Sequence, residues 1–397
     1  MEYQIIPLSQ VGQIVSGATP KTSEPDYFGG DIAWLTPADL SGYTDKYISH
    51  GARNITQKGY DSCSTQLMPA GTVLFSSRAP IGYVAIARNP ICTNQGFKSI
   101  IPNPNVDSEF LYYQLKYLKK QIQDMGSGTT FREISAKTLG KVFVVVPSLE
   151  EQKRIVARIE ELFSELDNGV ETLRKTKQQL AVYRQAVLKD AFSGDWQYYK
   201  AEGLCDFITK GTTPKKNDQL KEGKIPFIKV YNLTFDTSLD FNIDPTYVSE
   251  EIHKGFLARS IVYPGDVLLN IVGPPMGKVS IVPDTYKEWN INQAIARFRC
   301  KDGLYNKFLA YFLGFAPTVE KMKSQSKATA GQFNLTLEIC RNIEIPLPAI
   351  EKQKEIVASI ESRLSVCDSI EKTVDIALQQ AEAMRQSILK QAFEGRL

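Results

Sequence analysis

The side chains best suited to chemistry in this chain are hydroxyls, cations and amides in short loop segments. A Gly-Ala-Thr-Pro-Lys run at residues 17–21 has a counterpart, Gly-Thr-Thr-Pro-Lys, at residues 211–215. Their threonine and lysine side chains suit contacts with phosphate oxygens. Two Asn-Gln dipeptides, 94–95 and 292–293, carry amides that could bond an adenine edge with two hydrogen bonds. This chemistry favours contact with nucleic acid, although such runs often only form turns and such amides often only cap them.

Two further segments, residues 126–132 and 327–334, are polar and basic, and each precedes the last strand expected in its half of the chain. Together with the four loops above, they define our candidate set. The predicted nucleic-acid contacts are Thr19, Lys21, Arg78, Asn94, Gln95, Lys98, Thr129, Thr130, Arg132, Thr213, Lys215, Lys216, Asn270, Lys278, Asn292, Gln293, Lys327 and Gln332.

No motif in the chain predicts a catalytic centre. The phosphate-binding pattern GxxxxGK[ST] is absent, and residues 273–279 have the wrong spacing for it. No GxGxxG follows a predicted strand, and no Asn-Pro-Pro-aromatic or Asp-Pro-Pro-aromatic tetrad occurs. The two histidines are unclustered and the six cysteines form no CxxC pair, which argues against a zinc site. We therefore expect recognition rather than catalysis, with no cofactor and no metal held by this chain.

Length and composition indicate a folded protein of more than one domain. The 397 residues exceed the roughly 100–200 of a typical single domain, and 43% hydrophobic with 23% charged residues excludes a disordered chain. No signal peptide and no run of about 18 apolar residues is present, so we expect no membrane association. Scattered cysteines favour a reduced, cytoplasmic protein. A net charge of +3 is too small to indicate nucleic acid by itself.

The chain contains an internal repeat. Residues 147–194 recur 201 positions later as residues 348–395 without a gap, and 21 of the 48 positions are identical. The preceding segments match more loosely, as in Pro-Ile-Gly-Tyr-Val-Ala-Ile at 80–86 and Pro-Met-Gly-Lys-Val-Ser-Ile at 275–281. Closely similar ends combined with divergent globular parts indicate shared assembly with two different recognition surfaces.

The repeated segments have the pattern of long helices. Apolar residues step by four and three from Ile155 to Val187 and from Ile356 to Ile388, as in a coiled coil. Arg363 interrupts the second series, although Leu364 beside it can take its place. Proline precedes each segment and glycine follows it, as at helix ends.

A helix of about 43 residues would be roughly 64 Å long and needs a packing partner. The two copies can supply each other's partner if a pseudo-two-fold axis sets them antiparallel. Four apolar residues lie beside the coiled-coil positions, and they either pack within this pair or dock another subunit. They are Val156, Phe163, Val357 and Leu364.

The remaining halves mix short β-rich runs, such as residues 72–75 and 266–270, with one helical stretch each, 108–123 and 305–322. We therefore predict an α+β fold with two globular domains joined by two long antiparallel coiled-coil helices. The predicted boundaries are 1–146 and 196–346 for the globular domains and 147–195 and 347–397 for the helices.

The complete pattern resembles the specificity subunit of type I restriction-modification systems. Each helical segment opens Pro-x-x-x-Glu-x-Gln-Lys-x-Ile-Val and closes Arg-Gln-x-x-Leu-Lys-x-Ala-Phe-x-Gly, and the loops at 15–21 and 208–215 are also similar to the family's. The resemblance implies a non-catalytic subunit whose two target recognition domains each read half of a split, asymmetric site in double-stranded DNA. It also implies that the helices space the half-sites.

The implied partners are two methylation subunits, which carry S-adenosylmethionine and methylate adenine N6, and nuclease/translocase subunits. Two other classes compete with this interpretation. A stand-alone methyltransferase would need a cofactor motif, and a coiled-coil adaptor would need no matching loop lysines and amides. The family is also served by half-length chains that dimerise, whereas the duplication here makes a monomer sufficient.

Overall fold

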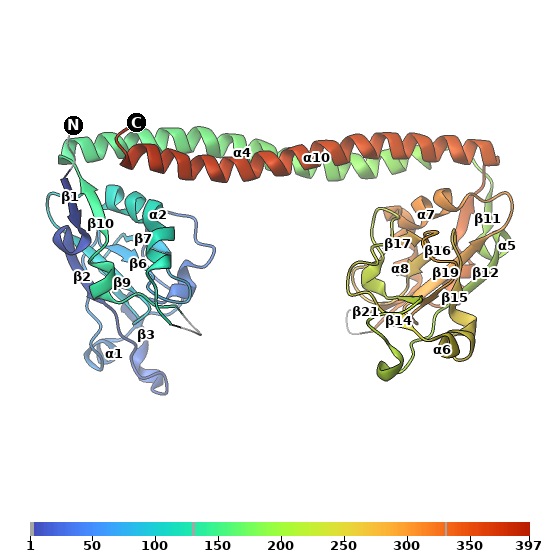
Figure 1. Cartoon of the computed structure of the whole chain (residues 1–397), viewed down its shortest axis with the longest axis horizontal. Helices are drawn as coiled ribbons and strands as arrows, with labels where there is room; N and C mark the ends of the chain where they lie inside the picture. The colour runs from blue at the N-terminus through green and yellow to red at the C-terminus, as the bar shows by residue number, and fades with distance from the viewer. Residues whose placement is uncertain (1–3, 129–131, 330–331) are drawn as a thin grey trace. The chain divides into compact units, whose positions relative to one another are not determined.

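The structure is a computed structural model that describes residues 4–128, 132–329 and 332–397. Its contacts divide the chain into two compact units. Unit 1 comprises Met1–Leu173 with Ile376–Leu397, and unit 2 comprises Arg174–Asp375. Figure 1 follows the chain through both units, whose elements recur in the same order, as the internal repeat predicts.

Unit 1 is built on a five-stranded sheet of order β2-β9-β6-β7-β5, in which β5 and β7 are parallel and the other pairs antiparallel. Helix α2 (Ser108–Asp124) packs against β6 and β7 (Figure 1). Val73 and Phe75 are buried on the α2 side and Leu74 on the other side, so the sheet is covered on both faces. The strands of this sheet are β2 (Gly12–Ser16), β5 (Tyr47–Ile48), β6 (Val73–Phe75), β7 (Val84–Ala87) and β9 (Lys98–Pro102).

Smaller elements complete unit 1. Strands β1 and β10 form an antiparallel ribbon, and β4 and β8 form a short parallel pair. The bounds are β1 (Gln4–Pro7), β3 (Phe28–Ile32), β4 (Trp34–Leu35), β8 (Cys92–Thr93), β10 (Phe143–Val146), α1 (Gln57–Asp61) and α3 (Ala136–Leu139).

Unit 2 contains two four-stranded sheets, β12-β19-β16-β17 and β14-β13-β18-β15. The first is covered by α7, as the equivalent sheet of unit 1 is by α2 (Figure 1). The sheet strands are β12 (Cys205–Lys210), β13 (Ile225–Ile228), β14 (Tyr247–Val248), β15 (Ile261–Val262), β16 (Val267–Asn270), β17 (Val279–Ile281), β18 (Trp289–Ile291) and β19 (Ile295–Cys300). The other elements are β11 (Tyr198–Lys200), β20 (Lys327–Thr329), β21 (Gln332–Asn334), β22 (Glu344–Pro346), α5 (Ala201–Leu204), α6 (Glu250–Lys254) and α9 (Leu337–Arg341).

The helix predicted over 305–322 is wrong as a single element. The structure has α7 (Asn306–Gly314) and α8 (Ala316–Gln325), separated at Phe315. Pro317 lacks the N–H that a continuous helix needs and its ring crowds the preceding turn, so the helix breaks and restarts with proline in the first turn of α8. The helix predicted over 108–123 is confirmed by α2.

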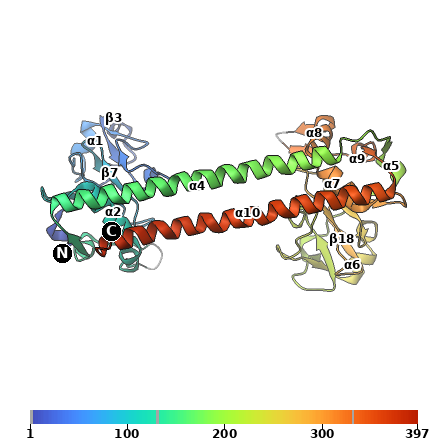
Figure 2. The same ribbon diagram turned by 90° about the horizontal axis from the view of Figure 1, so that it is seen from above.

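The two long helices are confirmed as α4 (Leu149–Ala191) and α10 (Ile350–Phe393). Each unit contains the beginning of one helix and the end of the other, lying side by side in opposite directions (Figure 2). In unit 1, Phe393 at the end of α10 packs edge to face on Phe110 of α2. In unit 2, Phe192 just after α4 packs in the same way on Phe308 of α7.

A buried glutamine joins the start of each long helix to its unit. The Gln152 side chain accepts a hydrogen bond from Asp107 N at 2.8 Å and donates to Asn105 O and Pro147 O, both at 2.9 Å. Gln353 makes the same three bonds in unit 2, with Tyr305 N at 2.8 Å, Gly303 O at 2.8 Å and Pro348 O at 2.9 Å. Both side chains are fully buried. The loop before α2 or α7 is thereby fastened to the helix N-terminus.

Candidate nucleic-acid interface

Three loops of unit 1 meet after the end of β2, after the end of β6 and before the start of β9. Backbone hydrogen bonds join these loops to one another. We call residues 17–21, 76–82 and 94–98 loop cluster 1. Ala18 N donates to Thr93 O at 3.0 Å and Ser77 N donates to Gly96 O at 2.7 Å. A fourth segment joins through Ile134 N, which donates to Ser77 O at 3.0 Å. Segments far apart in the sequence therefore form one surface.

Unit 2 repeats this arrangement in residues 211–216, 270–278 and 292–295, which we call loop cluster 2. Thr212 N donates to Ile291 O at 3.2 Å, and Ile271 N donates to Ala294 O at 2.8 Å. Leu335 N donates to Ile271 O at 2.8 Å, as Ile134 does to Ser77 in the first copy. The backbone of the two clusters is thus held by equivalent hydrogen bonds.

Glycines 17 and 211 permit the closest approach in each cluster. A Cβ atom on Gly17 would lie 2.1 Å from Thr93 O and 2.2 Å from Asn94 O. On Gly211 it would lie 2.1 Å from Ile291 O and 2.2 Å from Asn292 O. Real Cβ atoms do not approach this closely, so only glycine lets the first loop pack against the Asn-Gln loop.

The asparagines of the predicted set act within the loops. Asn94 accepts a hydrogen bond from Gly96 N at 2.8 Å, and Asn292 accepts one from Ala294 N at 3.2 Å, so each caps its own turn. Asn270 is fully buried, donates to Pro275 O at 2.8 Å and accepts from Lys278 N at 2.9 Å. These amides shape the loop backbone, which is the turn-capping alternative that the sequence left open.

Arg78 and Lys98 form a charged group with Glu133 in unit 1. Glu133 lies 3.8 Å from Arg78 and 3.9 Å from Lys98, between their charged atoms. The Lys98 side chain is only 11% exposed. Burial lowers the pKa of Lys98, Glu133 opposes this change and Arg78 reinforces it. The group therefore offers a concentrated positive charge that a phosphate would stabilise.

The other predicted contacts of cluster 1 lie nearer the surface. Lys21 is exposed, 3.8 Å from Glu24, and Arg132 is exposed. The Thr19 hydroxyl donates to the Gln95 side chain, which joins the first loop to the Asn-Gln loop through their side chains. Thr129 and Thr130 lie outside the described residues.

In cluster 2, Thr213, Lys215, Lys216 and Gln293 are exposed. Thr213 also accepts a hydrogen bond from Gln293 N at 3.4 Å, the counterpart of the Thr19–Gln95 contact. Its predicted residues therefore present two ammonium groups that are adjacent along the chain, and one amide from another loop that reaches Thr213.

Lys278 is the last residue of the 270–278 loop of cluster 2, just before β17, and its ammonium lies 5.9 Å from the centre of the exposed Phe235 ring. Lys327 and Gln332 belong to the backbone of the β20–β21 ribbon, paired with Asn334 and Thr329 respectively. Val272 bridges to Asn334, which brings this ribbon beside the cluster.

Two relevant features were missed by the sequence reasoning. Arg259 donates to Thr212 Oγ1 at 3.3 Å and adds a cation beside cluster 2, but nothing in its local sequence marked it. Gln152 and Gln353 were noted only as positions of the helix-opening motif, without a structural role. Their identity in both copies of the repeat was the signal that each has a role.

The four apolar residues beside the coiled-coil positions divide into two kinds. Val156 and Val357 are 6% and 2% exposed and belong to the cores of their units, which is the packing alternative. Phe163 and Leu364 are only partly buried against those cores. Phe163 packs edge to face on Tyr113, and the Arg385 guanidinium lies 5.0 Å from the centre of the Phe163 ring.

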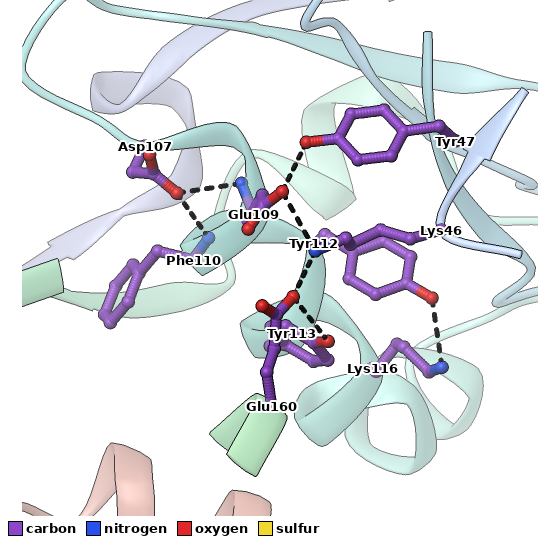
Figure 3. A network of polar contacts seen from close by, with 9 residues as sticks. All are labelled: Lys46, Tyr47, Asp107, Glu109, Phe110, Tyr112, Tyr113, Lys116 and Glu160. Atoms are coloured by element: carbon purple, nitrogen blue, oxygen red, sulfur yellow. Dashed lines mark hydrogen bonds and ion pairs between the residues drawn. The ribbon is translucent and has the colours of Figure 1, made fainter. Parts of the chain in front are cut away.

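A polar network in unit 1 ties strand β5, α2 and α4 together (Figure 3). Lys46 lies between two carboxylates, pairing with Glu109 of α2 at 2.9 Å and with Glu160 of α4. Tyr47 donates to Glu109, and Tyr113 donates to Glu160 at 3.3 Å. Burial alone would raise the pKa of Glu109, but hydrogen bonds from Tyr47 and Lys46 bring it below its ordinary value of 4.5.

Within the part of the chain that the structure describes, no cluster of three His, Cys, Asp or Glu residues could hold a metal ion. The described helices include none that is both long and apolar enough to cross a membrane. The exposed lysines, hydroxyls and amides of the two clusters can pair with and hydrogen-bond to an anionic partner.

Comparison with known proteins gives one consistent family. A family model described as type I restriction modification DNA specificity domain matches residues 1–180 and 193–380. The MjaIX specificity subunit of Methanocaldococcus jannaschii is 36% identical over 256 residues, which are 58% of this chain and 58% of that protein. The EcoBI specificity subunit of Escherichia coli is 27% identical over 420 residues, covering 99% of this chain and 85% of that one.

Solved structures share the fold. A chain from a study of complex assembly and conformational transition in a type I R-M system superimposes with a TM-score of 0.78 at 21% identity, covering 100% of this chain and 98% of that one. The HsdS subunit from Thermoanaerobacter tengcongensis superimposes with a TM-score of 0.59 at 20% identity, covering 100% and 97%.

Proposed function

Because the chain belongs to the type I restriction modification DNA specificity family, we propose that it reads a split, asymmetric sequence in double-stranded DNA. The similar proteins of known type are specificity subunits, and this chain has the same non-catalytic recognition role. Loop cluster 1 would read one half-site and loop cluster 2 the other. We assign the two recognition domains to residues 1–146 and 196–346.

The observation that carries this proposal is the contrast between backbone and side chains in the two clusters. Equivalent hydrogen bonds hold both backbones, and Lys21 and Lys215 occupy equivalent places, yet Arg78 and Lys98 are cations of cluster 1 alone and Lys216 and Lys278 of cluster 2 alone. A shared scaffold with different side chains suits two DNA segments of different sequence. An asymmetric site follows from this difference.

The predicted contacts fall into two roles under this proposal. Lys21, Lys215 and Lys216 are exposed cations suited to phosphate, which positions the protein without reading sequence. Gln95 and Gln293 are exposed amides suited to base edges. The capping asparagines would act by setting the loop shape.

We propose that two methylation subunits dock on the long helices and bring S-adenosylmethionine, and that nuclease/translocase subunits join that assembly. Exposed apolar side chains on the helices support a docking role. Val366 is 58% exposed and Ile370 41% in unit 2, and Ile376 is 46% and Met384 53% exposed in unit 1. The partly buried Phe163 and Leu364 would extend these surfaces.

Coexpression with a methylation subunit tests the function directly. Sequencing of modified adenines in the host should reveal one motif made of two unlike half-sites separated by unspecified bases. Exchanging residues 211–216 and 292–295 for those of a relative should change one half-site and leave the other. Methylation that ignores the exchange would refute the assignment of cluster 2, and a complex that forms but binds no DNA would favour the adaptor alternative.

A further inference from the structure

Two cysteines of unit 2 face each other across an antiparallel ladder. Cys205 begins β12, Cys300 ends β19, and they are direct partners in the pairing of these strands. Lys301 N donates to Leu204 O at 3.0 Å just beyond this pair. The register of the ladder shifts by one residue between Cys205 and Phe207, so the two cysteines form the last pair of the ladder, next to a bulge.

That position has the geometry that a disulfide requires. Residues directly opposite each other in an antiparallel pair have Cα atoms about 4.5–5.5 Å apart. Disulfides join Cα atoms roughly 4.4–6.8 Å apart. The backbone of β12 and β19 therefore needs little movement to let the two sulfur atoms bond.

The two thiols already interact. The Cys300 thiol is hydrogen-bonded with the Cys205 side chain, and this bond together with burial raises the pKa of Cys300. Cys205 is 4% exposed, whereas Cys300 is only partly buried. All six cysteines are free thiols in the structure.

The other cysteines lack this arrangement. In unit 1 the Cys63 thiol donates to Gly59 O at 3.7 Å, and burial together with the nearby Cys63 raises the pKa of Cys92 to about 11. Neither of these two faces another cysteine across a described strand pair. Cys205 and Cys300 are therefore the pair best placed to react.

A small molecule can reach Cys300 from solvent. Cys300 lines a surface cavity of about 460 Å³ together with Arg299, Lys301 and Asp302. Arg299 is committed to a two-bond pair with Asp266, at 2.8 and 2.7 Å. Lys301 and Asp302 add one cation and one anion, so the lining carries no net charge and admits a polar reagent of either sign.

We propose that Cys205 and Cys300 are an oxidation site at which a low-molecular-weight disulfide, such as oxidised glutathione, closes an intramolecular disulfide. The Cys300 thiol loses its proton, and the thiolate attacks one sulfur of the reagent and releases one thiolate. The Cys205 thiolate then attacks the Cys300 sulfur and releases the second. Two protein thiols are oxidised, the reagent is reduced to two thiols, and the two released protons end on them.

The disulfide would link β12 and β19, the strands that lead to two loops of cluster 2. It would lie at the end of the ladder that is farther from those loops. The linked residues are 95 positions apart, so the bond constrains a long stretch of the unfolded chain. We expect the thermal midpoint of unit 2 to rise by roughly 5–10 °C on oxidation. Because only the thiolate reacts, the closure rate should rise about tenfold from pH 7 to pH 8.

The test uses the full wild-type chain incubated with oxidised glutathione. Digestion after acidic residues gives peptides 203–206 and 289–302, whereas trypsin would leave Cys300 in a dipeptide. We expect these two peptides to be joined, with four thiols still free and a raised thermal midpoint. The control Cys63→Ser should behave like wild type, and Cys205→Ser should give only glutathione attached to Cys300 with no rise.

Three results would overturn the proposal. They are a folded wild-type chain that keeps six free thiols at an oxidising poise, a disulfide that joins other cysteines, and glutathione on Cys300 without closure in the wild-type chain. If a serine variant fails to fold, the measurement on the wild-type chain is sufficient to decide the proposal.

Discussion

Single residues decide whether the loops can come together. Gly17 and Gly211 leave room for the carbonyl groups of the Asn-Gln loop, and any side chain at these positions would push the first loop away. Asn94 and Asn292 then hold the turn that those carbonyls belong to. The shape of each cluster thus depends on a glycine, which has no side chain, and on an asparagine whose amide caps the turn.

The variant Gly211→Ala should separate the loops of cluster 2. A Cβ atom 2.1 Å from Ile291 O forces the backbone to move, at a cost of about 1–3 kcal/mol. We expect lower stability and a large loss of DNA affinity, measured by urea unfolding and by a gel-shift assay. Gly203→Ala is the matched control, since a Cβ there meets nothing within 4 Å and the residue lies in a helix. Equal DNA affinity in both variants would contradict the loop geometry.

The lysines of cluster 2 should contribute without regard to sequence. Replacing Lys215 and Lys216 by alanine should weaken binding to all duplexes alike and flatten the dependence of log affinity on log salt by about two units. Fluorescence anisotropy over a salt series measures this slope. The exposed helix residue Lys372, replaced by alanine, is the control and should leave the slope unchanged. A changed preference among duplexes would instead give these lysines a reading role.

Secondary-structure elements are joined to the long helices by a small number of buried polar contacts. Gln152 and Gln353 fasten the loops before α2 and α7. Glu160 receives Lys46 and Tyr113 in unit 1, and its counterpart in the repeat, Glu361, receives Lys307 at 2.7 Å in unit 2. The two units therefore use equivalent helix positions with different partners.

Gln353→Leu should loosen the joint between α10 and unit 2. Leucine fills the space but leaves Tyr305 N, Gly303 O and Pro348 O without partners, at an expected cost of about 3 kcal/mol. Chemical unfolding followed by circular dichroism measures the loss. Gln179→Leu on the exposed face of α4 is the control and should change stability by less than about 0.5 kcal/mol. A neutral Gln353→Leu would show that the joint does not depend on these bonds.

The Glu109 network should make unit 1 sensitive to acid. Since the pKa of Glu109 is lowered in the folded state, its contribution is complete above the ordinary value of 4.5 and is lost as pH falls through the lowered pKa. Glu109→Gln should therefore be less stable than wild type at about pH 6, and this difference should shrink towards about pH 3. Thermal unfolding across this range checks the sign. A difference that stays constant with pH would exclude a role for the carboxylate charge.

Repeats, helix ends and helix pairing could be predicted from the sequence because they follow from spacing. Ile155, Ile159 and Val187 are buried as the spacing requires. Tyr183 and Met384, equivalent positions on the same stripe, are 44% and 53% exposed. Arg363 hydrogen-bonds to Tyr183 and pairs with Asp190, so this level of the helix pair is polar.

The roles of individual loop amides could not be predicted, because they depend on contacts between distant segments. Asn270 was predicted to contact nucleic acid, yet its side chain is buried and bonds to Pro275 and Lys278 within the loop. Lys98 was recognised as a cation, but its burial beside Arg78 and Glu133 requires three separate segments to meet. The local sequence does not show which distant segments come into contact.

At the scale of the whole molecule, each unit combines the start of one long helix with the end of the other, and unit 1 takes its second helix segment from the opposite end of the chain. The core of unit 1 includes Leu389, Ala392 and Phe393, more than 200 positions away from most of its residues. The core of unit 2 includes Leu188 and Phe192, which occupy the same places in the repeat. Neither half of the sequence contains all of a unit.

A half-length chain, residues 1–195, should therefore form a dimer. Without residues 376–397, the surfaces of Phe110 and Tyr117 that pack on Phe393 become exposed. Phe192 of a second copy is the equivalent side chain and can cover them. Light scattering should give twice the monomer mass, and Phe192→Asp in the half-length chain should abolish the dimer. A folded monomer of residues 1–195 would contradict this use of the helix ends.

The glutamine contacts at the starts of the long helices also affect how globular domains can be exchanged by recombination. Gln152 and Gln353 contact only main-chain atoms outside their own helices, and such atoms are present whatever side chains the neighbouring domain carries. A globular domain introduced by recombination could therefore form the same hydrogen bonds with the glutamine, provided that its backbone followed the same path. The repeated segments at 147–194 and 348–395, identical at 21 of 48 positions, are the natural places for such exchanges to begin and end. New combinations of half-sites could then arise in one step, without a period of selection to repair the helices.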